Sequence, residues 1–291
     1  MAPCLWAAPH DMPPHLADNA PRLKPAPTHS MASLLRAWQR RRALARDPIP
    51  PALWQQGVNA LLLLDGLDAP ALERLRRLVV PFLAEKRLYG AHGLEVNPAM
   101  ALNIALQACL PILELGLDWY DEWTTVVVYE DDFLPRHEVM DEMGILHVED
   151  MPYSGEAWER GPVLLSWGGM ARGEALAIHE FTHTLDMRNG AANGMPPLNR
   201  EMRVQDWTRI MTAAYDDLSR RLDLEQPCDF DPYAVTDPGE FFAVMSEYFF
   251  AQPRVLQRGY PDVYAQFRQF YRQDPAERRM LRAPMPIRSD R

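Results

Sequence analysis

Residues 174–190 read EALAIHEFTHTLDMRNG and contain the pattern H-E-x-x-H between positions 179 and 183. The spacing of the apolar residues predicts a helix that ends at the final Asn-Gly, because glycine just past the last turn commonly stops a helix. Residues four positions apart project from one helix face, so the imidazoles of His179 and His183 can bind one metal ion. Neutral imidazole suits zinc, and the Glu180 carboxylate is placed to take a proton from a nearby water.

The third ligand of such a site has several candidates, since catalytic zinc normally has three protein ligands. His183 is the last histidine in the chain, so the remaining ligand should be a carboxylate. Glu240 and Glu247 lie seven residues apart on a predicted helix and therefore face the same side. Glu240 also fits a capping box that begins at Asp237, so the residues alone favour Glu240 only slightly and keep Glu247 as a competitor. Asp186, three residues after His183, is a third candidate, although we expect it to orient an imidazole or cap structure.

The composition is that of a globular protein, with 291 residues, 47% of them hydrophobic, and a formal charge of −10. A chain of this length buries a full core without a disulfide or structural metal, so a metal here is expected to be functional. The three cysteines show no C-x-x-C spacing, which argues against a disulfide framework, a thiolate zinc site and a purely structural zinc. Cysteine usage and the missing secretion signal fit a reducing cytoplasm.

The basic residues are almost all arginine, because Lys24 and Lys86 are the only lysines. We interpret this as a compositional bias of the genome. The net acidity argues against a nucleic-acid partner, and no apolar stretch is long enough to suggest a membrane partner. The cluster Arg40, Arg41 and Arg42 is able to contact an anionic surface, but a solvated helix face is the favoured interpretation.

The chain is expected to comprise a disordered extension over residues 1–30, which contain seven prolines, and a single domain over 31–291. Met31 opens helix-forming sequence and is a candidate natural start. Most of the domain should be helical, with a few strands in its middle. Helices are predicted over 72–88, 99–117 (kinked or divided at Pro111), 174–188, 206–222, 238–250 and 261–271, and strands over 124–129 and 161–167.

Three segments resemble the Mlc titration factor A family of bacterial zinc peptidases: GPVLLSW (161–167), HEFTHTLDMRNGAANGMPPL (179–198) and DPYAVTDPGEFFAVMSEYFF (231–250). The likeness covers roughly residues 48–280. The resemblance implies that His179, His183 and Glu240 hold one zinc ion, that Glu180 is the catalytic base and that Tyr233 belongs to the active site. It also implies aminopeptidase-like activity and binding of a glucose-responsive transcriptional repressor.

The resulting expectation is an α+β, mainly helical, zincin-like metallopeptidase with a small central sheet. In the expected reaction Glu180 accepts a proton from the attacking water, and Tyr233 donates a hydrogen bond to the developing oxyanion. The partner is then a peptide or protein substrate. The alternative is a binding protein that sequesters a transcriptional repressor, with hydrolysis secondary. Substrate preference, cleavage mode and oligomeric state stay open.

Overall fold

The computed structural model describes residues 31–130, 161–172 and 175–278; the predicted disorder of residues 1–30 falls outside these ranges. Three parallel strands form a sheet in the order β1 (Arg87–Gly90), β2 (Thr125–Tyr129) and β3 (Val163–Ser166). In the register of this sheet, Val126 lies between Leu88 of β1 and Val163 of β3. The helices are α2 (Met31–Arg46), α3 (Pro51–Ala60), α4 (Ala69–Glu85), α5 (Pro98–Cys109), α6 (Trp167–Ala171), α7 (Leu176–Asp186), α8 (Val204–Asp223), α9 (Pro238–Ala251), α10 (Pro253–Gly259) and α11 (Pro261–Tyr271).

Short 3-10 helices complete the described elements: η1 (Leu62–Leu64), η2 (Leu117–Tyr120), η4 (Met187–Asn189), η5 (Pro232–Val235) and η6 (Pro275–Glu277). The prediction of a mainly helical protein with a small sheet is confirmed. Among the described residues, no helix combines the length and apolar character needed to cross a bilayer.

Local chemistry explains where several helices begin. The Asp68 side chain accepts a hydrogen bond from the amide of Ala71 and starts α4 three residues before the predicted position. The helix expected up to residue 88 ends at Glu85, because Arg87 and Leu88 pair with β2 as part of a strand that the sequence did not reveal. Pro111 does separate two elements, since α5 ends at Cys109.

The end of β3 also differs from the prediction. The strand predicted over 161–167 ends at Ser166, because Trp167 already belongs to the short helix α6 together with Gly168 and Gly169. The Ser166 hydroxyl accepts a hydrogen bond from the amide of Gly169 and caps this helix. The chain therefore turns from β3 through α6 toward α7 within a few residues.

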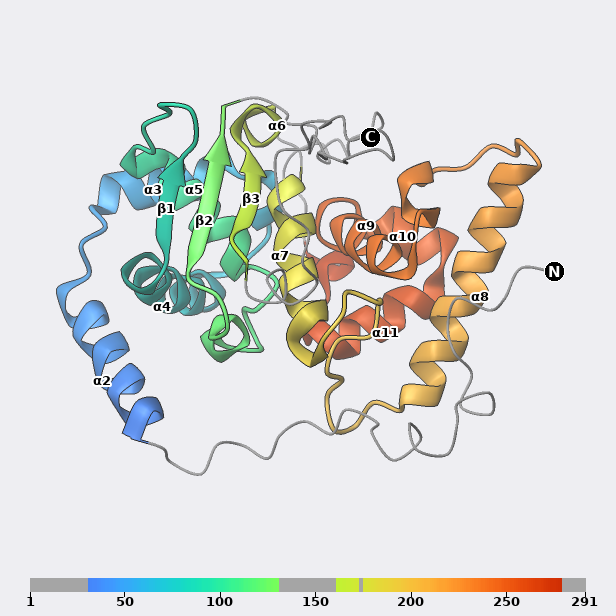
Figure 1. Cartoon of the computed structure of the whole chain (residues 1–291), viewed down its shortest axis with the longest axis horizontal. Helices are drawn as coiled ribbons and strands as arrows, with labels where there is room; N and C mark the ends of the chain where they lie inside the picture. The colour runs from blue at the N-terminus through green and yellow to red at the C-terminus, as the bar shows by residue number, and fades with distance from the viewer. Residues whose placement is uncertain (1–30, 131–160, 173–174, 279–291) are drawn as a thin grey trace, which may run out of the picture.

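Helix α7 occupies the middle of the molecule, between the sheet and the C-terminal helices (Figure 1). Nine of its eleven residues are buried, as are twelve of the fourteen residues of α9, which packs against it. Phe181 of α7 contacts the rings of Tyr120 and Trp123 on the side of the sheet. A helix buried nearly all round holds its side chains in fixed positions, so polar groups on it need partners inside the protein.

Candidate metal centre

Three side chains from α7 and α9 converge at one point. Nε2 of His179 lies 3.1 Å from Nε2 of His183 and 3.0 Å from Oε2 of Glu240. Nε2 of His183 lies 3.5 Å from Oε1 of Glu240. The His179 side chain is only 3% exposed, whereas those of His183 and Glu240 are 17% and 16% exposed. The cluster is thus closed on the protein side and reachable from solvent on the other.

These residues fit a zinc ion in both chemistry and spacing. Two imidazole nitrogens and one carboxylate oxygen are the donor set of many catalytic zinc sites. A tetrahedral ion with bonds near 2 Å separates its ligand atoms by about 3.3 Å, close to the contacts among these three side chains. Burial acts to raise the pKa of Glu240, but its contacts with His179 and His183 prevail and hold that pKa well below its usual range. The carboxylate is therefore kept in the ionised form that binds cations.

Glu247 lies behind the cluster. Its Oε1 atom is 2.8 Å from Nδ1 of His179, on the side of the ring away from Glu240 and His183. An ionised carboxylate only accepts hydrogen bonds, so Nδ1 carries the proton and Nε2 keeps its lone pair for the cluster. The structure therefore separates the two glutamates that the sequence left in competition, since Glu240 reaches the common point and Glu247 orients His179.

The position of Glu240 follows from how α9 begins. Asp237 is the N-cap, Pro238 occupies the first turn, and the Asp237 side chain accepts a hydrogen bond of 3.0 Å from the Glu240 amide. The predicted cap is thus present at Asp237, while the Glu240 carboxylate is directed to the histidines. At Gly239 a Cβ atom would lie 3.0 Å from the carbonyl oxygen of Ala192, so a glycine lets the loop after α7 pass close to this helix start.

Tyr233 lies in η5, beside the histidines, with its ring centroid 6.2 Å from that of His179. Hydrogen bonds fix the backbone on both sides of this ring. The Tyr248 hydroxyl accepts from the amide of Asp231, and the Tyr215 hydroxyl donates to the carbonyl oxygen of Val235. Sequence reasoning alone did not single out Tyr215 or Tyr248, because their role depends on how α8 and α9 pack against η5.

Glu180 and Asp186 have different surroundings on α7. Glu180 is half-buried and follows His179 directly. Asp186 is fully buried, and its Oδ2 accepts a hydrogen bond of 2.6 Å from the amide of Gly194. Burial raises the pKa of Asp186 to about 7, although hydrogen bonds from loop amides act in the opposite direction. The structure thus places Asp186 at the loop after α7, and the carboxylate next to an imidazole Nδ1 is that of Glu247.

Comparison with known proteins adds family membership to this geometry. Residues 35–272 match the family of glucose-regulated metallopeptidases M90. The chain belongs to this family. It is 38% identical to Mlc titration factor A of Cronobacter sakazakii over 252 residues, which cover 84% of this chain and 94% of the relative.

Further relatives carry the same name. The identity is 41% to Mlc titration factor A of Salmonella arizonae, over 78% of this chain and 92% of the relative, and 37% to that of Klebsiella pneumoniae, over 78% and 88%. The predicted resemblance to the Mlc titration factor A family is confirmed. Membership in M90 indicates a metallopeptidase, a hydrolase that depends on a metal.

Proposed function

We propose that this M90 protein is a zinc-dependent peptidase whose ion is held by His179, His183 and Glu240. The observation that carries the proposal is the convergence of the two Nε2 atoms and the Glu240 carboxylate within 4.8 Å of one another. The H-E-x-x-H spacing and the family membership support it. A zincin-like arrangement, in which a glutamate from a second helix completes the site, agrees with the packing of α9 against α7.

The chemistry that zinc supplies when bound is Lewis acidity, which polarises a peptide carbonyl and makes water a competent nucleophile near neutral pH. In the proposed reaction the Glu180 carboxylate takes a proton from the attacking water and passes it to the leaving amine. The Tyr233 hydroxyl donates a hydrogen bond to the oxygen that gains charge as the carbonyl is attacked. Glu247 holds the His179 ring in one tautomer and orientation throughout.

Glu180→Gln tests this proposal, because it removes the base while keeping the size of the side chain. Peptide hydrolysis should fall roughly a hundredfold or more, as expected for loss of a general base. The zinc content of the purified variant, measured by mass spectrometry, should stay near one ion per chain. Glu201→Gln, at a side chain that is 82% exposed, is the matched control and should keep full activity. A wild-type protein without stoichiometric zinc, or an active Glu180→Gln variant, would contradict the proposal.

The mode of cleavage is proposed to be aminopeptidase-like. Small substrates with one amino acid joined to a chromogenic amine should be hydrolysed, whereas the same substrates with an acetylated amino group should not. Peptides with a fluorophore and a quencher around an internal bond provide the comparison. Faster cleavage of the internal bond would overturn this mode but leave the zinc peptidase intact.

A second candidate function is binding of a transcriptional repressor, which would place the protein in the cytoplasm. The name of the relatives, Mlc titration factor A, favours it. The Glu180→Gln variant separates the two functions. Repressor binding that survives the loss of hydrolysis would be independent of catalysis, and binding lost together with hydrolysis would tie the partner to the active site.

A further inference from the structure

Helix α2 lies at the edge of the sheet-containing half of the molecule (Figure 1). It presents apolar side chains to solvent. Seven large apolar side chains of the described residues are strongly exposed, and four of them lie within the first eight residues of α2. They are Met31, Leu34, Leu35 and Trp38, exposed by 83%, 51%, 54% and 54%. Contiguous apolar exposure of this kind marks a surface that contacts another phase or molecule.

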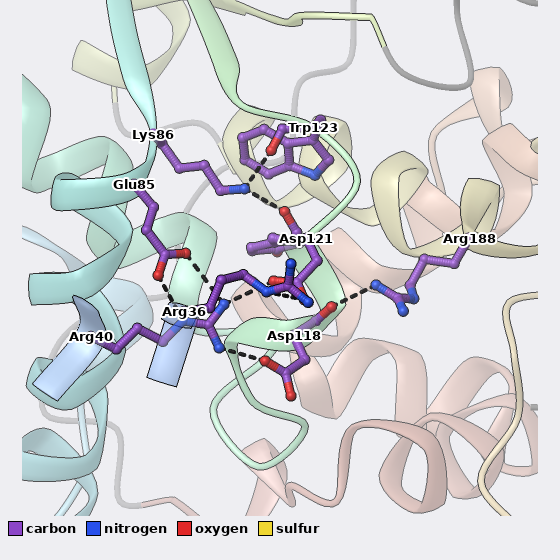
Figure 2. Close-up of polar contacts among 9 residues, drawn as sticks. Arg36, Arg40, Glu85, Lys86, Asp118, Asp121, Trp123 and Arg188 are labelled. Atoms are coloured by element: carbon purple, nitrogen blue, oxygen red, sulfur yellow. Dashed lines mark hydrogen bonds and ion pairs between the residues drawn. The ribbon is translucent and has the colours of Figure 1, made fainter. Parts of the chain in front are cut away.

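The opposite face of α2 is held by charged residues. The Arg40 guanidinium pairs with Glu85 at the end of α4 and with Asp118 and Asp121 in and after η2, at 2.7 Å to Glu85 and 2.8 Å to Asp121. Arg36 lies 3.4 Å from Asp121. Figure 2 shows these arginines pointing into the acidic group beneath the helix.

Beneath α2 a hollow of about 410 Å³ separates it in part from α4. Ion pairs of Arg36 and Arg40 thus attach the middle of the helix, while Ala43 and Leu44 near its end pack against the core. Together these contacts fix which face looks outward. Between Met31 and Arg40 the usual amphipathic arrangement, with apolar residues inside and charges outside, is therefore reversed. The apolar face therefore stays available for a partner while the helix remains attached.

The charge of the outward face restricts the chemistry of a partner that binds there. α2 contains five arginines and no acidic residue, although the whole chain carries −10. Arg41, Arg42 and Arg46 are exposed and make no salt bridge among the described residues, while Arg42 lies over the Trp38 ring at 5.3 Å. A partner that complements this face is apolar and anionic.

Polarity changes along the axis of α2. The exposed apolar side chains fill its first two turns and span about 10 Å along the axis, and the three free arginines follow them. A helix that fills a protein groove presents apolar anchors along several turns. Two copies paired along the whole of α2 would set arginines against apolar side chains if antiparallel and arginines against arginines if parallel. A helix whose end enters the headgroup region, about 5–10 Å deep, needs an apolar tip followed by cations at the phosphates.

We propose that α2 docks the protein peripherally on a membrane rich in anionic phospholipid, with Leu34, Leu35 and Trp38 in the interface and Arg41 and Arg42 at the phosphates. This docking replaces the solvated face that the sequence favoured for the arginine cluster. It requires no membrane-spanning helix and is independent of the proposed peptidase activity. It would hold the protein beside substrates at the membrane surface.

Flotation of the full chain with vesicles tests the proposal. Binding to phosphatidylcholine vesicles that contain about 30 mol% phosphatidylglycerol should exceed binding to pure phosphatidylcholine at least tenfold, and should fall with added salt. Arg41→Gln should weaken binding about fivefold, and Leu35→Gln combined with Trp38→Gln about tenfold or more. Circular dichroism of each variant shows that the fold is retained.

Matched controls lie elsewhere on the surface. Leu224→Gln removes an apolar side chain that is 61% exposed, and Arg258→Gln removes an exposed arginine of α10. Both should bind vesicles like the wild type. Equal binding to neutral vesicles, no binding to anionic ones, or unchanged binding of the Leu35/Trp38 variant would overturn the proposal. The proposal would also be overturned if the wild type were a dimer in solution, the Leu35/Trp38 variant were a monomer, and neither protein bound vesicles. A second copy of the chain would then occupy the apolar face.

Discussion

Nδ1 of His179 lies 2.8 Å from Oε1 of Glu247, and both side chains are almost completely buried, at 3% and 1% exposure. The pair joins the two central helices: His179 belongs to α7 and Glu247 to α9, seven residues after Glu240. One face of α9 thus provides a carboxylate to each side of the same imidazole. The orientation of the proposed zinc ligand His179 is in this way tied to the packing of the two helices.

Glu247→Ala should weaken zinc binding by about ten- to a hundredfold, because the loss of a partner at the second ring nitrogen frees the imidazole. Chelator competition on the purified protein measures the affinity. Glu247→Gln keeps an oxygen that can accept a hydrogen bond from Nδ1, so this variant should retain part of the zinc affinity that Glu247→Ala loses. A role in folding alone predicts equal zinc affinity in all three folded proteins, and that result would remove Glu247 from the site.

Glu240→Gln should lower the zinc affinity more than either Glu247 substitution does, because Glu240 is a proposed ligand and Glu247 contacts a ligand from behind. Zinc affinity is expected to drop by more than about a hundredfold, with loss of peptidase activity. The Asp237 cap accepts from the backbone amide of Glu240 and stays in place, so α9 should still form. Isothermal titration with zinc checks the order of the variants. A Glu240→Gln protein that binds zinc more tightly than Glu247→Gln would reverse the assignment of the two glutamates.

Tyr233→Phe should leave zinc affinity unchanged and lower kcat by roughly a hundredfold, because only the proposed hydrogen bond to the oxyanion is lost. The ring keeps its place, since η5 is fixed by backbone contacts of Asp231 and Val235. Steady-state kinetics with one chromogenic substrate give kcat and KM separately. An effect on KM alone would show that the tyrosine binds substrate without stabilising the transition state.

Much of this site was predictable from local sequence. The spacing within α7 places two histidines on one face, and the seven-residue spacing of Glu240 and Glu247 places both carboxylates on one face of α9. Which glutamate meets which nitrogen was not predictable, because it depends on where α9 crosses α7. Tyr233 came only from family resemblance, since its place beside His179 depends on η5, whose neighbouring residues Val235 and Asp231 are hydrogen-bonded to side chains of α8 and α9.

Prediction of the fold from the sequence was limited in the same way, because some elements depend on contacts with distant residues. Helices α9 and α11 begin at the predicted residues, Pro238 and Pro261, because proline is favoured at the first position of a helix. Strand β1 escaped prediction because its four residues, Arg87–Gly90, lack β-branched side chains and are extended only through pairing with β2. The strand predicted up to residue 167 stops at Ser166, because the Ser166 side chain caps a helix that begins at Trp167.

Lys86 is a buried lysine in an arginine-rich chain. Its ammonium group donates to the backbone carbonyl oxygens of Tyr120 and Trp123 and lies 4.1 Å from the centre of the Trp123 ring (Figure 2). Burial lowers the pKa of Lys86 to about 8, against the attraction of Glu85 and Asp121. A neutral amine still has two hydrogens for the two carbonyls, so deprotonation keeps both hydrogen bonds.

The free energy of unfolding should therefore rise between pH 8 and about 10.5 through this group. In that window the folded protein has released the Lys86 proton while the unfolded chain, with its ordinary lysine pKa, still binds it. The gain is at most about 3 kcal/mol relative to pH 7. Because the chain has only two lysines, Lys24 and Lys86, a lysine-labelled sample gives two NMR signals that Lys24→Arg assigns. A Lys86 signal with a midpoint near 10.5 would contradict this prediction, and stability would then be independent of Lys86 over the same window.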